Sequence, residues 1–227
     1  MGMLTTVLLA AALAVPLDVR SFQVLARDSG PENYYRVIDP GAELILRGIY
    51  SPPLQTVTLF APLPDRFRNG VRRIRWRWRA IELPSGGNEC VEGRGDSAAA
   101  VYVTWKRGLR WYSLKFVWST AAPLGATCNS IRNPFVASDS IVLRSGGGGS
   151  RWVEEEIDPA ALFRQHFGGE VPELQGLGIL TDGDQTRSTS AADYAGFELT
   201  EDASAQRPAP VRSSPAGHAP GRLSRRF

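Results

Sequence analysis

Histidine is scarce in this sequence of 227 residues, and its scarcity narrows the available chemistry. Only two histidines occur, and His218 lies in a segment of low complexity. A histidine-rich metal site or a Ser-His-Asp triad is therefore hard to build. The signatures G-x-S-x-G, H-E-x-x-H, the Walker loop and a G-x-G-x-x-G after a strand are also missing. Any enzymatic activity would have to rest on carboxylates such as Asp96, Asp182 and Asp184.

Lysine and long apolar runs are scarce as well. Since Lys106 and Lys115 are the only lysines among 26 basic residues, the other 24 are arginines, and the 23 acidic residues leave a net charge of +3. This surplus is too small to indicate a nucleic-acid partner. Apolar runs stay well short of the roughly 18 residues that a transmembrane helix requires. We therefore expect no membrane span in the mature protein.

An apolar run at residues 4–14 predicts an export signal. It ends in Ala12-Leu13-Ala14, a small-x-small pattern of the kind that signal peptidases cut, although Met1-Gly2-Met3 contains no lysine or arginine. We expect residues 1–14 to be a signal peptide, and the protein to be exported to the periplasm, the cell envelope or the medium. The alternative is a buried first strand or helix.

The composition predicts one folded domain followed by a tail. Hydrophobic residues make up 43% and charged residues 22%, which is ordinary for a soluble globular protein. We expect a single domain over residues 20–199. After Leu199 the chain is rich in proline and arginine and poor in apolar residues, which predicts a disordered tail over residues 200–227. A solvated tail is favoured over one that binds an anionic surface.

Short runs of β-forming residues, separated by proline and glycine, predict an all-β fold. Turn sequences such as Asp39-Pro40-Gly41 lie between the runs. This spacing indicates an antiparallel β-sandwich or barrel rather than βαβ units. The Gly146–Gly149 run is expected to form a flexible hairpin. The candidate strands are Phe22–Ala26, Tyr34–Ile38, Glu43–Ile49, Thr56–Phe60, Val71–Ala80, Ala99–Trp105, Trp111–Trp118, Ser140–Arg144, Trp152–Ile157, Gly176–Leu180 and Tyr194–Leu199.

One short helix is expected within the β pattern. Asp158 is a candidate N-cap, Pro159 suits the first helical position, and Gly168-Gly169 closes the segment. The apolar face of this helix, which includes Phe163, would close one end of the sandwich. His166 is expected to be a partly buried structural residue rather than a catalytic base.

The segment Arg73–Arg79 alternates arginine with Ile74, Trp76 and Trp78. In a strand, a period of two places the three apolar side chains on one face and the four arginines on the other. The arginines could form a cationic ladder for an acidic polysaccharide or single-stranded nucleic acid. Alternatively, this is a core strand whose arginines face water or pair with Glu154–Glu156. We favour the core strand, because alternation separates the tryptophans from the arginines.

Exposed aromatic rings would suit a glycan ligand, because a pyranose presents C–H groups to the negatively charged face of a ring. Large aromatic side chains are also ordinary core residues. Trp105 and Trp111 flank a Lys106-Arg107-Gly108 turn. They are therefore predicted to be an exposed pair.

Asp96 lies in the sequence Arg94-Gly95-Asp96-Ser97, which contains the tripeptide that integrins recognise. A match of three residues is weak, and the segment is interpreted as a loop before a strand. Asp96 either braces this loop or acts as an acid in a binding site. Bracing is favoured.

The segment Thr181–Ser188 has oxygen-bearing side chains at alternate positions. With Asp193 eleven residues after Asp182, these side chains have the ligand spacing of a calcium loop. Arg187, however, stands at the sixth position, where an EF-hand requires glycine. The flanking segments are also predicted to be strands rather than helices. An irregular calcium site is therefore the form that this pattern allows.

Three interpretations of the loop Asp182–Ser188 remain open. In the first, Asp182 and Asp184 point together and hold Ca²⁺, joined by Thr186, Ser188 or backbone carbonyls. In the second, the loop binds a ligand directly, with Arg187 as the partner of an anionic group. In the third, the two carboxylates point apart: Asp182 caps a turn through a local backbone bond and Asp184 is solvated. The turn is slightly favoured, because such bracing is common in loops of this composition.

Cys90 and Cys128 are the only cysteines. In an exported chain, two cysteines most simply form one disulfide. Closing a loop of this length would stabilise the fold by about 4 kcal/mol in the chain-entropy description. The alternative is two free thiols in polar loops.

Taken together, the ordered motifs resemble an uncharacterised bacterial family, domain of unknown function 3047. The resemblance covers residues 20–199, but Phe197 follows Gly196 where family members often have an acidic residue. It implies an exported or envelope β-sandwich, similar in outline to jelly-roll, galactose-binding-like carbohydrate-binding modules, and it implies no reaction. The matching stretches are IRWRWRAIELP, GDSAAAVYVTW, LKFVWS, SIVLRSG followed by WVEEEID, and GLGILTDGDQT with AADYAGFEL.

The leading functional hypothesis is a non-catalytic, exported β-sandwich that binds a glycan or another component of the cell envelope. Calcium is the one cofactor considered. The alternatives are a carboxylate-based enzyme that acts on polysaccharide, and a structural module that binds a partner. The candidate ligand-binding residues are Asp96, Trp105, Trp111, Asp182, Asp184, Thr186 and Arg187.

Overall fold

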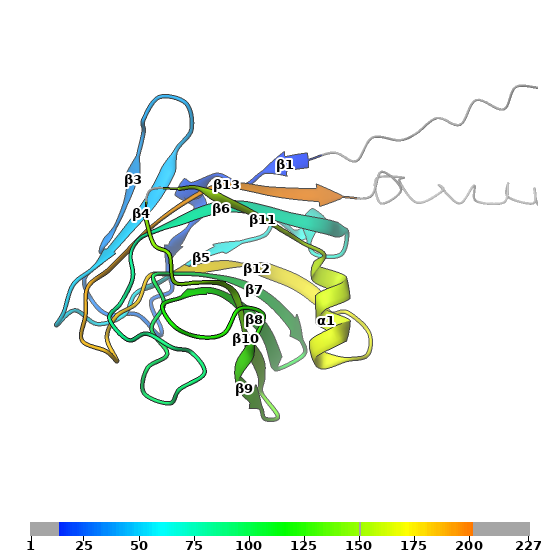
Figure 1. Ribbon diagram of the computed structural model, residues 1–227. Coiled ribbons are helices and arrows are strands. Elements are labelled where there is room, and N and C mark those ends of the chain that lie inside the picture. Colours follow the sequence, from blue (N-terminus) through cyan, green and yellow to red (C-terminus); the bar gives the residue numbers. More distant parts are fainter. Residues whose placement is uncertain (1–13, 150, 202–227) are drawn as a thin grey trace, which may run out of the picture.

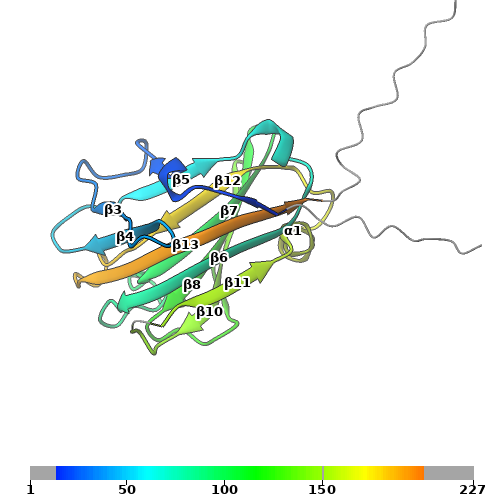
Figure 2. The same ribbon diagram turned by 90° about the horizontal axis from the view of Figure 1, so that it is seen from above.

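The computed structural model describes residues 14–149 and 151–201, which form two β-sheets packed face to face (Figures 1 and 2). The expected signal peptide, apart from Ala14, and the expected tail from residue 202 onward lie outside the described residues. Strand β1 (Ala14–Pro16) pairs with β13 (Ser190–Glu201). None of the described helices is long and apolar enough to cross a membrane.

Sheet A, the upper layer in Figure 1, consists of antiparallel pairs around the long strands β6 and β13. The two are 12 residues long each and lie side by side (Figure 2). The order across the sheet is β11 (Val153–Ile157), β6 (Val71–Glu82), β13, β4 (Ile45–Tyr50) and β3 (Tyr35–Ile38), with β1 added on β13.

Sheet B is the lower layer, and the chain passes between the two layers six times between β4 and β13. Such repeated crossing is the kind of path found in jelly-roll sandwiches. The order across sheet B is β2 (Gln23–Val24), β5 (Thr58–Pro62), β12 (Glu173–Leu180), β7 (Ala99–Arg107), β8 (Arg110–Ser119), β10 (Val136–Ser145) and β9 (Thr127–Arg132).

The prediction of an all-β sandwich with one short helix is confirmed, and each of the candidate strands corresponds to a strand of the structure. Two details differ. Strands β8 and β10 are parallel, because β9 lies at the sheet edge and β10 returns between β9 and β8. The Gly146–Gly149 run is not a hairpin, since it connects β10 in sheet B with β11 in sheet A.

The core between the sheets is built from alternating side chains, as the segment Arg73–Arg79 illustrates. Ile74, Trp76 and Trp78 of β6 are buried, and the intervening arginines lie on the other face. Arg75 pairs with Glu156 of β11 at 2.8 Å. The core-strand interpretation is therefore confirmed, and these arginines form an ion-paired outer face of sheet A.

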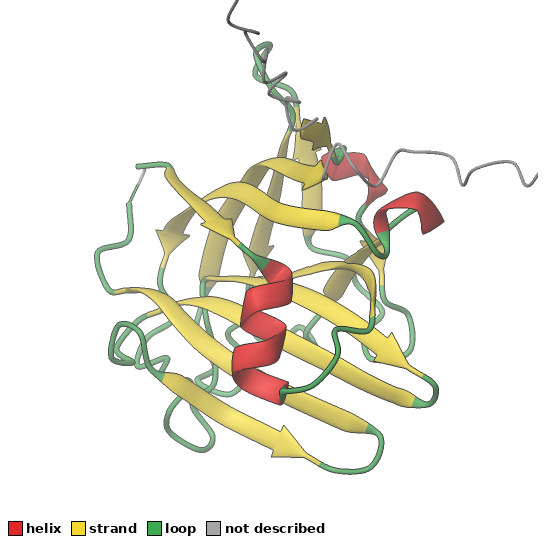
Figure 3. Cartoon of the chain, turned by 90° about the vertical axis from the view of Figure 1, so that its right-hand side faces the viewer, coloured by secondary structure: helices red, strands yellow, loops and turns green. Residues whose placement is uncertain are grey.

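Helix α1 (Pro159–Phe167) closes one end of the sandwich (Figure 3). The Asp158 carboxylate accepts a hydrogen bond of 2.8 Å from the Ala161 N–H, which confirms the predicted cap. Phe163 is buried, with its ring 5.4 Å from Trp105. His166 lies 2.8 Å from the buried carboxylate of Asp139, in the structural role expected of it.

Candidate functional site

The outer face of sheet B carries a short row of paired side chains on β7 and β8. Val101, Val103 and Trp105 of β7 point into the core, so Tyr102, Thr104 and Lys106 point away from it. Directly opposite on β8 lie their cross-strand partners. We call the six residues together the outer strip: Tyr102 with Lys115, Thr104 with Ser113, and Lys106 with Trp111.

The outer strip has a symmetrical arrangement. Each end pairs an aromatic residue with a lysine, and hydroxyl groups lie between the ends. The Lys106 ammonium lies 4.8 Å from the ring centroid of Trp111, and the Lys115 ammonium lies 5.8 Å from that of Tyr102. From Tyr102 to Lys106 the strip spans about 14 Å along β7. Both lysines of the chain thus lie on this one face.

The two tryptophans that the sequence predicts to be an exposed pair are separated by the sheet. Trp111 is 39% exposed, as predicted, but Trp105 is 1% exposed and packs in the core, so its prediction is wrong. The register explains the difference, because Trp105 pairs with the inward-facing Tyr112 and Lys106 pairs with Trp111. Trp105 is therefore removed from the candidate ligand-binding residues.

Two glycines in β12 let aromatic rings lie close to the sheet beside the outer strip. A Cβ on Gly176 would lie 2.3 Å from Cζ of Phe60 and 2.5 Å from the carbonyl oxygen of Ala61. A Cβ on Gly178 would lie 3.2 Å from Cβ of Tyr102. The sequence reasoning missed Phe60 and Tyr102. The signal that points to them is the Gly-x-Gly inside a strand, which marks a face where another group approaches the backbone.

Carboxylates gather at the Tyr102 end of the same sheet. Asp96 precedes β7 and Asp182 follows β12, and the pairing of Leu180 with Ala100 brings these two chain ends together. Asp96, Asp182 and Asp184 each place one carboxylate oxygen within 4.8 Å of the others. The structure therefore unites three acidic residues that the sequence left in two separate motifs. We call them the aspartate cluster.

Two members of the aspartate cluster brace their loops. Asp182 accepts hydrogen bonds from the N–H of Gly183 at 2.8 Å and from the hydroxyl of Thr56 at 2.9 Å. Asp96, which is buried, accepts a bond of 2.6 Å from the N–H of Thr186. The bracing expected at Asp96 and the local backbone bonds expected at Asp182 are present, the latter including the N–H of Asp184 at 3.3 Å. The carboxylates of Asp182 and Asp184 nevertheless lie together rather than apart, so the turn does not exclude a cation site. Asp184 is exposed, as that turn interpretation expected.

Electrostatics distinguish Asp182 from its neighbours. Burial raises the pKa of its carboxyl to about 6, and the charges of Asp184 and Asp96 act in the same direction. The ammonium of Lys115 opposes this rise. Although burial lowers the pKa of Lys115, the neighbouring Tyr102 and Asp182 raise it overall. Asp182 and Lys115 therefore link the aspartate cluster to the outer strip.

Most of the remaining residues of the loop Asp182–Ser188 are exposed or half-buried. Thr186 and Ser188 share a hydroxyl hydrogen bond of 2.7 Å, and Arg187 is exposed with a φ of 54°. Asp193 does not belong to the loop, because it lies within β13 and forms ion pairs with Arg47 and Arg79. The calcium-loop spacing that included Asp193 is therefore wrong.

Calcium binding by Asp182 and Asp184 stays a prediction, now with Asp96 as a third oxygen donor. The separation of the carboxylate oxygens fits Ca²⁺, whose ligands lie about 2.3–2.6 Å from the ion. Calcium at a hundredfold excess over its Kd is expected to stabilise the fold by about 2.7 kcal/mol. Asp184→Ala should abolish the rise in melting temperature, and the exposed Asp28→Ala should keep it. Equal melting temperatures in Ca²⁺ and in chelator would count against this site.

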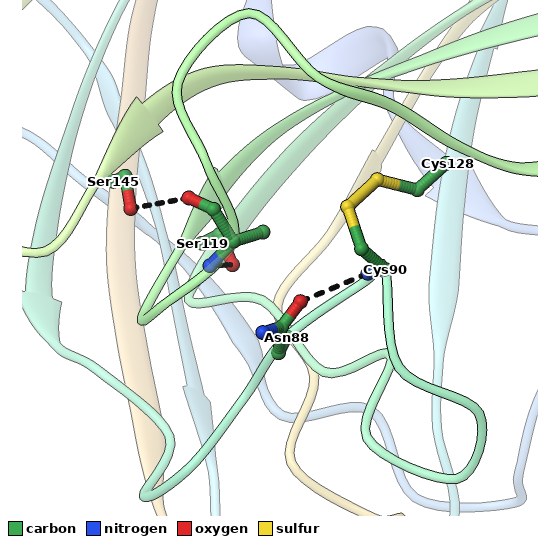
Figure 4. Close-up of a disulfide and its surroundings, with 6 residues drawn as sticks. Asn88, Cys90, Ser119, Cys128 and Ser145 are labelled. Atoms are coloured by element: carbon green, nitrogen blue, oxygen red, sulfur yellow. Dashed lines mark hydrogen bonds between the residues drawn. A yellow bond between two sulfur atoms is a disulfide. The ribbon is translucent and has the colours of Figure 1, made fainter.

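The predicted disulfide is present between Cys90 and Cys128, with a Cα–Cα distance of 4.9 Å (Figure 4). Cys128 lies on β9 rather than in a loop, whereas Cys90 belongs to the segment before β7. The bond attaches this segment to the edge strand of sheet B. Beside it, Glu89 is fully buried, and burial raises the pKa of its carboxyl.

Comparison with known proteins gives one family and a set of similar folds. The family described as "Protein of unknown function (DUF3047)" matches residues 68–198. No curated protein matches the chain.

Among solved structures, a family 11 carbohydrate-binding module from Clostridium thermocellum, in complex with a β-1,3-1,4-mixed-linked tetrasaccharide, is similar. It shares 9% identity over 84% of this chain and 96% of the module, with a TM-score of 0.44. The family 29 module CBM29_1 from Piromyces equi shares 10% identity over 85% and 93%, with a TM-score of 0.39. The xyloglucanase domain of NopAA from Sinorhizobium fredii shares 10% over 80% and 93%, with a TM-score of 0.41.

Proposed function

The chain belongs to the DUF3047 family, and because that description names no activity, we propose from the geometry of sheet B that the protein binds a glycan along the outer strip. One observation carries the proposal. Two aromatic residues stand about 14 Å apart on one face, with the hydroxyls of Thr104 and Ser113 between them.

Each part of the outer strip suits a different part of a sugar chain. The rings of Tyr102 and Trp111 offer π-faces to the C–H groups of pyranose rings. The hydroxyls of Thr104 and Ser113 can donate to and accept from sugar hydroxyls. Ser138 of β10 extends this hydroxyl row, since it pairs with Ser113. A ligand that alternates apolar faces and hydroxyl groups matches this order of side chains.

The strip favours a chain-like ligand over a small molecule held in a pocket. The cavity beside α1, which Trp105 and Arg164 help to line, has a volume of about 160 Å³, and a second one at Trp118 and Trp152 has about 580 Å³. Neither cavity is lined by a residue of the outer strip. The strip runs along paired strands and is half-buried except at the exposed Trp111, so that an extended polymer can lie along it.

Loss of the exposed ring tests this proposal. Against mixed-linkage β-glucan, xyloglucan, xylan and polygalacturonate, we expect Trp111→Ala to weaken the binding of any bound polymer about tenfold, because one stacking surface is lost. The double variant Thr104→Val/Ser113→Ala should also weaken it, by about tenfold for the hydrogen bonds removed. Isothermal titration calorimetry or affinity electrophoresis measures both.

Trp152→Ala is the matched control, because this tryptophan lies against Arg77 and Arg79 on the other sheet. Equal losses for Trp111→Ala and Trp152→Ala, or no binding to any glycan by the wild-type protein, would contradict the proposal.

The aspartate cluster favours one alternative, a carboxylate-based enzyme acting on polysaccharide. A carboxyl with a pKa of about 6 can act as a general acid near neutral pH. Reducing ends or unsaturated products released in the same incubations, and lost in Asp182→Asn, would favour this enzyme over a binding module.

The disulfide supports the proposal that the protein works in an oxidising compartment outside the cytoplasm.

A further inference from the structure

The α1 end of sheet B carries a group of strongly exposed apolar side chains. Leu109, in the turn between β7 and β8, is 80% exposed, and Phe135, in the turn between β9 and β10, is 62% exposed. The two turns lie at the same end because β8 and β10 are parallel and both begin there. The N–H of Trp111 donates to the carbonyl of Phe135 at 2.8 Å, which joins the two turns.

Cations surround these apolar side chains. Lys106 and Arg107 end β7 and Arg110 begins β8, on either side of the turn. In the described part of the chain none of the three forms an ion pair with a carboxylate. Arg107 donates to the backbone carbonyl of Glu170, and the Arg110 guanidinium lies 5.2 Å from the ring centroid of Tyr112. Their charges are therefore free to meet an external anion. We call Lys106–Trp111 together with Phe135 the basic tip.

Other arginines near the tip or on sheet A take part in ion pairs, which sets the basic tip apart from them. Arg132, which ends β9, is paired with Asp139 at 2.8 Å. On β6, Arg75 pairs with Glu156, Arg77 with Glu43 and Arg79 with Asp193. Two acidic residues lie beside the tip: Glu173, the cross-strand partner of Lys106, and the exposed Glu170, whose backbone carbonyl accepts from Arg107. Three cations beside two acidic residues leave the tip with a net positive charge.

We propose that the basic tip docks on the surface of an anionic lipid bilayer. Exposed Leu and Phe side chains at turns can enter the boundary between headgroups and acyl chains, where Trp is also favoured. Lys and Arg side chains beside them are attracted to anionic headgroups. Leu124 is also strongly exposed, at 70%, but it lies in the loop between β8 and β9, which has no charged residue. The cations therefore distinguish the tip from this other exposed leucine. The charge of the tip selects an anionic surface as its occupant.

Sedimentation with vesicles tests the proposal. The full chain is expected to bind vesicles of equal parts phosphatidylglycerol and phosphatidylcholine, and to bind pure phosphatidylcholine much less. Leu109→Ala/Phe135→Ala should weaken binding to the anionic vesicles by about tenfold or more. Arg107→Gln/Arg110→Gln should weaken it about thirtyfold, and binding should fall with added salt.

Leu124→Ala is the control for an exposed leucine without cations, and its binding should match that of the wild type. All variants keep residues 202–227, so binding through the arginines of that segment is common to every sample. Binding that Leu109→Ala/Phe135→Ala leaves unchanged, or that Leu124→Ala reduces equally, would overturn the proposal, as would failure of the wild type to bind anionic vesicles. Leu109 and Phe135 lie outside the outer strip, so glycan binding by this double variant is expected to persist.

Discussion

Replacement of both cysteines, Cys90→Ser/Cys128→Ser, is expected to lower the free energy of unfolding by about 4 kcal/mol. The bond joins residues 38 positions apart in the sequence. In the chain-entropy description, a cross-link of this length removes many conformations from the unfolded chain and thereby stabilises the folded state. Denaturant unfolding of the oxidised wild type and of the double variant measures the difference.

The reduced wild-type protein provides the control, since it should unfold at the same denaturant concentration as the double variant. Thiol labelling of the unreduced, denatured protein should find no reactive cysteine. Two reactive thiols, or an unchanged unfolding midpoint, would contradict this prediction. The loss is expected to exceed that of most single surface substitutions, which usually change stability by less than about 0.5 kcal/mol.

Asp193→Ala is expected to destabilise the fold by about 3 kcal/mol or more, because it removes one side of a buried ionic group. The Asp193 carboxylate is fully buried in the middle of sheet A. Its two oxygens lie 2.6 Å from Nε of Arg47 on β4 and 2.6 Å from Nη2 of Arg79 on β6. Both arginines are also its cross-strand partners, so one carboxylate connects three adjacent strands.

Glu198→Ala is the matched control for this substitution. Glu198 lies on the same strand, but its side chain is 42% exposed and its carboxylate forms a long ion pair of 3.9 Å with Arg75. An exposed pair of this kind contributes about 0–1 kcal/mol. Denaturant unfolding should therefore separate the two variants clearly. Similar destabilisation by both would mean that the buried position of Asp193 makes no difference to its ion pairs.

The sequence alone determined the features that depend on residues close together in the chain. The period-two pattern of β6 predicted which side chains enter the core, and the Asp158 cap with Pro159 predicted the helix. The turn at Asp182 also follows from local hydrogen bonding. Strand β9 escaped prediction, since its side chains other than Cys128 are exposed and show no alternation.

Only the tertiary structure decided which side chains meet across strands, because register depends on partners far away in the sequence. Trp105 and Trp111 both flank one turn, yet the register of β7 and β8 places the first in the core and the second on the outer face. Pairing of β7 with β12 brings Asp96 beside Asp182, and pairing of β13 with β4 and β6 gives Asp193 to two arginines. Spacing along the chain cannot show that Asp182 lies in a loop and Asp193 within a strand, because the difference depends on which strands pair beside them.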